Sequence, residues 1–267
     1  MRTTQSGGAG VPRSQFPLML AVLLLLVFAP LATAAPKITF KATPVPIPGF
    51  PGTGNLLGAQ AAVEVNATIS GSEYGGFPSP LTALNLFAPA GVKIDPEGFL
   101  ACAVAALEAN GIEGCPKRSR AGPPGEGLGV VSFGGTRVNE KVSINGVFAA
   151  AGGLIFYVEG SSPAYFQVLE KAHWVTALPP YGPELLVEVP LVETVPGAND
   201  ASILSFKVRV GAAFRKRGRT MSYITLAKHC PGRGGFPVKA EMKFLSGETV
   251  TAVYKQPCPK GQGALAR

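Results

Sequence analysis

Residues 63–69 read Val-Glu-Val-Asn-Ala-Thr-Ile. Residues 63, 65, 67 and 69 would share one face, because side chains alternate between the two faces of a strand. This alternation predicts a half-buried β-strand. It recurs at 138–148, 185–191, 204–210, 238–244 and 250–254, and apolar runs at 81–87, 128–133, 154–158 and 221–226 also have strand-like composition. About ten strands separated by turn residues predict an all-β fold, an antiparallel β-sandwich of jelly-roll-like or immunoglobulin-like type.

The composition agrees with a turn-rich globular protein. The 267 residues include 34 Gly and 25 Pro, with 46% hydrophobic and only 15% charged residues. A charged disordered chain and a coiled coil both need far more charge than this. The glycines and prolines follow no three-residue period, which excludes a collagen-like chain.

One short helix is expected near residues 96–110. Asp95 could cap it, Pro96 suits its first turn, and the Ala- and Leu-rich run 99–109 ends at Asn110-Gly111. Cys102 would lie on this helix and Cys115 just after it. The four cysteines predict two disulfides; of the three pairings, we favour Cys102 with Cys115 and Cys230 with Cys258, since each pair brackets one compact unit.

The N-terminal residues have the order of a secretory signal peptide. Arg2 and Arg13 precede the apolar run 18–29, and Ala32-Thr33-Ala34 supplies an A-x-A cleavage pattern. We therefore expect cleavage after residue 34 and a secreted protein that could associate with the cell surface, with no membrane anchor. Residues 35–58, rich in Pro and Gly, predict an extended lead-in, 59–260 a single β-sandwich domain, and 261–267 a flexible tail.

Several segments carry a family resemblance. They include 54–58 (Gly-Asn-Leu-Leu-Gly), 69–77 (Ile-Ser-Gly-Ser-Glu-Tyr-Gly-Gly-Phe), 89–92 (Pro-Ala-Gly-Val) and 129–135 (Gly-Val-Val-Ser-Phe-Gly-Gly). Over about residues 50–260 the chain resembles a family of uncharacterised exported proteins from high-GC Gram-positive soil bacteria. The resemblance implies export and a β-rich fold, and it carries over no catalytic residues.

Positive charge is concentrated in the C-terminal part. Residues 201–267 have a net charge of +11, and residues 35–200 a net charge of −5. Clustered cations attract anionic polymers, so an envelope polyanion is one candidate partner. The same cations could instead balance acidic neighbours or protect a strand edge. The candidate anion-binding residues are Lys207, Arg209, Arg215, Lys216, Arg217, Arg219, Lys239 and Lys243.

Aromatic residues gather in one short segment that contains the only Trp. Tyr165, Trp174 and Tyr181 are candidates for stacking against a sugar, since flat aromatic faces bind polysaccharide in many secreted sandwiches. The alternative is that these residues pack in the core.

Motifs for catalysis are lacking in the sequence. There are two histidines, His173 and His229, and no nucleophile motif, metal-ligand spacing or nucleic-acid-recognition motif. We therefore expect no cofactor, no metal and no specific nucleic acid. The function expected is that of a secreted non-catalytic binding or structural protein; the alternative is a polysaccharide hydrolase acting through Glu carboxylates, for which Glu184 and Glu188 share a strand face.

Overall fold

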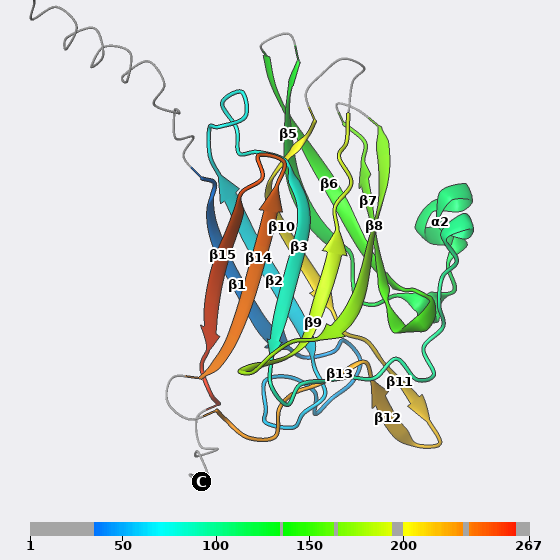
Figure 1. Cartoon of the computed structure of the whole chain (residues 1–267). Coiled ribbons are helices and arrows are strands. Elements are labelled where there is room, and N and C mark those ends of the chain that lie inside the picture. The colour runs from blue at the N-terminus through cyan, green and yellow to red at the C-terminus, as the bar shows by residue number, and fades with distance from the viewer. Residues whose placement is uncertain (1–34, 134–135, 163–164, 194–199, 232–234, 260–267) are drawn as a thin grey trace, which may run out of the picture. The chain divides into compact units, whose positions relative to one another are not determined.

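Antiparallel pairing joins eleven strands into one sheet in the computed structural model, which describes residues 35–133, 136–162, 165–193, 200–231 and 235–259 (Figure 1). The predicted leader and tail lie outside these residues. In sheet order the strands are β1 (Lys37–Val45), β2 (Ala62–Ser70), β10 (Ser202–Val210), β5 (Gly125–Phe133), β6 (Thr136–Phe148), β7 (Leu154–Gly160), β8 (Phe166–Thr176), β9 (Tyr181–Glu188), β3 (Leu81–Pro89), β14 (Phe236–Phe244) and β15 (Thr249–Gln256).

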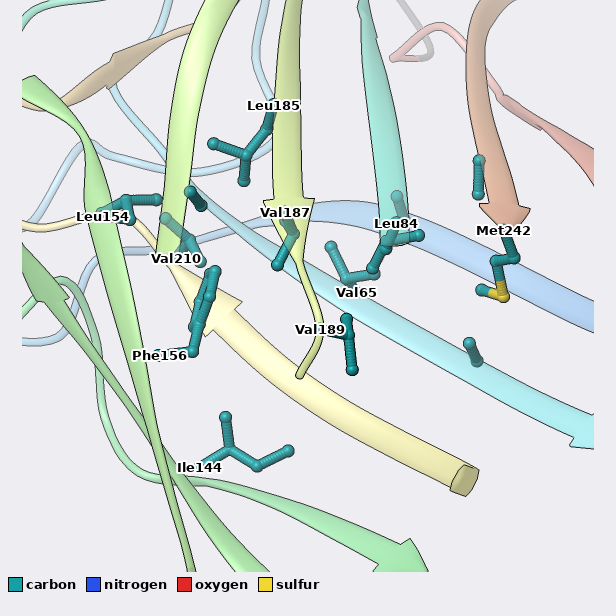
Figure 2. Close-up of a cluster of buried hydrophobic side chains, with 14 of the residues drawn as sticks. Val65, Leu84, Ile144, Leu154, Phe156, Leu185, Val187, Val189, Val210 and Met242 are labelled. Carbon is teal, nitrogen blue, oxygen red and sulfur yellow. The ribbon is translucent and has the colours of Figure 1, made fainter. Parts of the chain in front are cut away.

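The sheet curls until its two edge strands, β1 and β15, lie beside each other. The period-two alternation then turns one face of every strand inward. Val65 and Ala67 of β2, for example, face the same core as Phe156 of β7 and Met242 of β14. Figure 2 shows part of this core, where Phe156, Val187 and Val210 lie close together. The two layers of the predicted sandwich therefore belong to one continuous sheet.

A second, smaller core lies on the outer face of the same sheet. Helix α2 (Val104–Asn110) buries Leu107 against Ile155 and Tyr157 of β7, and the Cys102–Cys115 disulfide belongs to this cluster. Short 3-10 helices η1 (Gly111–Gly114) and η2 (Lys117–Ser119) follow α2, and η3 (Ala150–Gly152) links β6 to β7. The helix therefore covers outward-facing apolar side chains that would otherwise meet water.

An aromatic cluster fills one end of the sheet interior. The ring centroid of Phe148 lies 4.6 Å from that of Phe99 and 4.5 Å from that of Tyr223, and Phe99 also contacts Phe214 at 5.0 Å. The Trp174 Nε1–H donates to the Tyr223 hydroxyl at 2.6 Å, and this hydroxyl donates to the Gly152 carbonyl at 3.0 Å. We call these five aromatic residues the aromatic plug.

Two small antiparallel pairs complete the described strands. β4 (Lys93–Ile94) pairs with β13 (Ile224–Thr225), and β11 (Ala213–Lys216) pairs with β12 (Arg219–Ser222). Arg217 and Gly218 form the two-residue tip between β11 and β12, with φ of 50° and 77°. Positive φ at both tip residues is the geometry that tight hairpins favour.

The predicted all-β class with one short helix is confirmed, and three local expectations change. The helix begins at Val104 instead of Pro96, because Asp95 accepts a hydrogen bond from the Glu97 amide in a turn and Gly98 has a φ of 82°. Cys102 therefore precedes the helix. The expected lead-in, 35–58, contributes edge strand β1, which tolerates Pro44 near its end. β8 was not expected as a strand.

Candidate functional site

An apolar cavity of about 140 Å³ lies inside the curled sheet. It is bordered by inward-facing side chains of the strands that form the two opposing layers. Val142, Ile144, Phe156 and Val158 line it from β6 and β7; the other apolar side chains that line it include Val65, Leu84, Leu86, Leu185, Val187, Phe206 and Val208. A cavity of this size is comparable with one that holds a benzene ring in other proteins.

Glycines in β5 explain part of the empty space. Residues 125–129 read Gly-Glu-Gly-Leu-Gly, so the inward positions 127 and 129 carry no side chain, and both glycines border the cavity. A Cβ on Gly127 would lie 2.8 Å from a methyl of Val142, whose side chain already covers that position. A Cβ on Gly129 would meet its nearest atom at 3.6 Å, an ordinary contact. Position 129 can therefore accept a side chain that fills the cavity.

Glu170 places a carboxyl among the apolar side chains that border the cavity. The inward positions of β8 are Phe166, Val168, Glu170, Ala172 and Trp174, and Glu170 lies opposite Phe156 of β7 in the register. Its side chain is half-buried. Burial among apolar neighbours raises the pKa of Glu170 from 4.5 to about 7.

The Glu170 carboxyl has neither a hydrogen bond nor an ion pair within the described ranges. Among the described residues that border the cavity, no Lys, Arg or His occurs. Glu140 also faces inward, from β6, and accepts a hydrogen bond from the Ser162 amide at 2.9 Å. Glu170 is therefore a half-buried acid, and no Lys, Arg or His among the described residues that border the cavity lies beside it.

A seam in the sheet lies next to Glu170. β8 pairs with β9 over Ala172–Thr176, and within the described ranges residues 166–171 have no strand partner on that side. Beyond β9 the chain stays beside β3, because the Val189 amide donates to the Thr82 carbonyl at 3.0 Å and so extends the β9–β3 pairing by one residue. The first half of β8 and residues 189–193 therefore lie on either side of an unpaired edge.

A surface groove of about 660 Å³ runs along the outside of this seam. Phe166, Val168, Pro190 and Val192 border both the groove and the cavity. These four apolar side chains thus form the wall between the interior and the surface. Among the described residues no backbone hydrogen bonds join the first half of β8 to residues 189–193, so movement of these side chains alone could connect the groove with the cavity.

The predicted basic residues divide into paired and unpaired groups. Lys207 and Arg209 share a strand face as expected, but both pair with Glu64 on β2, at 3.8 and 2.8 Å. The Arg209 hydrogen bond contributes most to holding the pKa of Glu64 below its ordinary value. Lys239 pairs with Glu241 at 2.6 Å and lies 3.6 Å from the centre of the Phe87 ring. Much of this charge is therefore balanced within the molecule.

The β11–β12 hairpin retains the largest unpaired group. Arg215, Arg217 and Arg219 are exposed and have no ion pair among the described residues, whereas Lys216 pairs with Glu97 at 3.6 Å. Lys243 is also exposed and without an ion pair there, and it lies on β14, outside the hairpin. The eight candidates therefore do not form one continuous patch.

The predicted aromatic residues are not brought together. Tyr165 is 68% exposed and precedes β8, whereas Trp174 lies near the other end of the same strand, in the aromatic plug. Nine residues of extended strand span about 30 Å. Tyr181 packs against Phe87, with ring centroids 5.5 Å apart. Trp174 and Tyr181 thus follow the core-packing alternative.

The candidate catalytic groups occupy ordinary surroundings. Glu184 accepts a hydrogen bond from Asn85 at 3.2 Å, and His173 and His229 are exposed. Glycoside hydrolysis uses a pair of carboxyls, but in the described part of the chain the cavity is bordered by one, Glu170. No metal-ligating cluster of three or more groups occurs among the described residues, and none of the helices there combines the length and apolar character needed to cross a membrane.

Both disulfides join the cysteines that the sequence favoured, Cys102 with Cys115 and Cys230 with Cys258. The sequence did not reveal the cavity or the inward position of Glu170 on its border. The available signal was the alternating glycines at 125–129 and one acid at an inward position of an otherwise apolar strand face. Comparisons with protein-family models, curated proteins and solved structures found no match.

Proposed function

We propose that this protein is an exported, non-catalytic binding protein that encloses an apolar molecule inside its curled sheet. The cavity carries this proposal, because native cores normally contain few voids larger than a water molecule. The two disulfides are compatible with an oxidising, extracellular environment. The signal-peptide pattern and the resemblance to exported bacterial proteins support the same location.

The size and lining of the cavity limit the ligand. A volume of about 140 Å³ accommodates a group of about six carbons, such as a short alkyl chain or a single ring. Each buried methylene contributes about 0.8 kcal/mol, so a six-carbon group contributes about 5 kcal/mol to binding. This apolar contribution alone corresponds to a dissociation constant of about 0.2 mM.

The direct test is calorimetric titration of 1-hexanol into the disulfide-bonded protein. We expect saturable binding that is weakened in Gly129→Val, whose added side chain takes up part of the cavity. Gly146→Ala is the matched control: its Cβ would meet its nearest atom at 3.5 Å, and Gly146 does not border the cavity. Absence of hexanol binding to the unmodified protein, or equal binding to Gly129→Val, would contradict the proposal.

A second candidate function is association with an anionic envelope polymer through the β11–β12 hairpin. The observation that favours it is the exposed group Arg215, Arg217 and Arg219, which has no ion pair among the described residues. Cations concentrated at a hairpin tip can approach a polymer that a flat sheet face cannot reach. Binding of this kind weakens steeply as salt rises, because counterions are released from the polymer.

Cosedimentation with purified cell envelopes over a salt series tests this second function. Replacing the three arginines by Gln should abolish salt-sensitive binding. Replacing Lys37, Lys41 and Lys93 by Gln removes the same charge from exposed positions elsewhere and should leave most of the binding intact. Equal losses in the two variants would show that net charge, and not the hairpin, governs the association.

A further inference from the structure

We propose that the molecule held in the cavity is an amphiphilic amine, whose apolar part fills the cavity and whose ammonium group pairs with Glu170 at the seam between β8 and residues 189–193. This inference rests on the proposed function and specifies its ligand. It follows from the position of Glu170, from the charges around it and from the break in strand pairing beside it.

Glu170 lies between Val168 and Ala172 on the inward face of β8 and opposite Phe156 of β7. A ligand whose apolar part contacts these walls brings its polar end to Glu170. An unpartnered carboxylate in apolar surroundings is costly, and a ligand that supplies its missing partner recovers that cost on binding.

The charges around the cavity determine the sign of the ligand. On β7 the inward neighbours are Leu154, Phe156 and Val158, and across the seam lie Val189, Pro190 and Val192, none of which carries charge. Glu140 on β6 also faces inward and accepts a hydrogen bond from the Ser162 amide at 2.9 Å. On the outer side, Glu108, Lys171 and Glu193 border the groove. An ammonium group finds an uncompensated acid here, whereas a carboxylate ligand would meet repulsion.

The seam supplies access. The half of β8 that contains Glu170 has no hydrogen-bonded strand on the β9 side in the part of the chain that the structure describes. The wall there consists of Phe166, Val168, Pro190 and Val192, which also border the outer groove. An amphiphile in the groove can therefore pass its apolar part between these side chains and leave its ammonium beside Glu170.

Protonation gives the inference a pH dependence. Burial raises the pKa of Glu170 to about 7, while an alkyl ammonium has a pKa near that of lysine, about 10.4. Between these values the acid is ionised and the amine is charged, so the ion pair is complete. Binding of the amine should therefore strengthen as pH rises from 5 to 8. Binding of a carboxylate of equal length should weaken over the same range.

The test compares hexylamine, 1-hexanol and hexanoate at pH 8 by calorimetric titration into the disulfide-bonded protein. We expect hexylamine to bind at least tenfold more tightly than 1-hexanol, and hexanoate to bind most weakly. Glu170→Gln keeps the shape of the side chain and removes its charge. It should lower the affinity for hexylamine at least tenfold and change the affinity for 1-hexanol less than twofold. Glu188→Gln is the control, because Glu188 is exposed on β9 and borders neither the cavity nor the groove. This variant should bind all three compounds as the unmodified protein does.

The outcomes separate the inference from the proposed function. If the three compounds bind with equal affinity, or if Glu170→Gln retains the preference for hexylamine, the inference is overturned and the apolar binding function stands. If none of the three binds to the unmodified protein, both are overturned. Binding of 1-hexanol by Glu170→Gln also confirms that this variant is folded.

Discussion

The two ends of the sheet interior differ in whether their polar side chains have hydrogen-bond partners. In the aromatic plug, the Trp174 indole and the Tyr223 hydroxyl complete a chain of hydrogen bonds to the Gly152 carbonyl. In the cavity, the Glu170 carboxyl has no partner among the described residues, and the glycines of β5 leave empty space in the same cavity. The same strands, β6 and β8, contribute to both ends.

This difference indicates that the aromatic plug contributes mainly to stability and the cavity mainly to the proposed binding. A filled, hydrogen-bonded interior stabilises a fold, whereas an apolar void and a buried acid without a partner both reduce stability. Departures of this kind concentrate where proteins bind ligands or carry out chemistry. The plug therefore accounts for the closure of one end of the interior, and the cavity end is available for binding.

Truncating a large side chain should distinguish the two ends most strongly. Tyr223 is fully buried in the plug, and Tyr223→Ala should lower the free energy of unfolding by about 4 kcal/mol. Phe166 is half-buried at the cavity wall, and Phe166→Ala should cost less than about 2 kcal/mol because it has fewer packed neighbours to lose. Urea denaturation measures both. Equal losses would show that the cavity end is packed as tightly as the plug.

The free energy of unfolding should depend on pH through the carboxyl of Glu170. Its pKa is raised from 4.5 in the unfolded chain to about 7 in the fold. Between these values the folded protein binds more protons than the unfolded chain, so stability falls as pH rises from about 4.5 to about 7. Glu170→Gln removes this loss. It should be more stable than the unmodified protein at pH 8, by up to about 3 kcal/mol, and similar to it at pH 4.

Urea denaturation at pH 4 and pH 8 measures this effect, with Glu108→Gln as an exposed control that should behave as the unmodified protein at both values. If Glu170→Gln shifts stability equally at pH 4 and pH 8, Glu170 does not titrate in an apolar environment. The contrast between the two ends of the interior would then be lost.

A smaller effect isolates the hydrogen bonds of the plug. Tyr223→Phe keeps the ring and removes the hydroxyl, which leaves the Trp174 Nε1–H and the Gly152 carbonyl without this partner. We expect a loss of about 1 to 2 kcal/mol in the free energy of unfolding. Tyr165→Phe, at a residue that is 68% exposed, should change stability by less than 0.5 kcal/mol. If Tyr223→Phe leaves the free energy of unfolding unchanged, these hydrogen bonds add no net stability.

Much of the fold could be predicted from alternation, because a half-buried strand imposes period two on its sequence. β2 and β14 follow this rule and were predicted with nearly the observed bounds. The disulfide pairing followed from the short separation within each pair. The start of α2 could not be predicted, because Asp95 and Pro96 suit a turn as well as they suit the first turn of a helix.

The proposed binding site could not be predicted from the sequence for a related reason. β8 places Glu170 at an inward position, which interrupts the apolar face by which a strand is recognised in a sequence. Glu170, the residue proposed to bind the ligand, is therefore also the reason that β8 was not predicted as a strand. Tyr165 and Trp174 then suggested a stacking platform, although they lie near opposite ends of the same strand, β8. The pairing of the basic residues with Glu64 likewise depends on β2 lying beside β10, which no local pattern reveals.

The central claim is that the half-buried carboxyl of Glu170 forms an ion pair with a cationic ligand. NMR of its side-chain carboxyl carbon tests this most directly. The carboxyl should titrate with a midpoint near pH 7 in the free protein. In the presence of saturating hexylamine the midpoint should fall well below 7, because the ammonium group stabilises the ionised form. A midpoint near 4.5 without hexylamine, or one that does not move when hexylamine is added, would contradict the account.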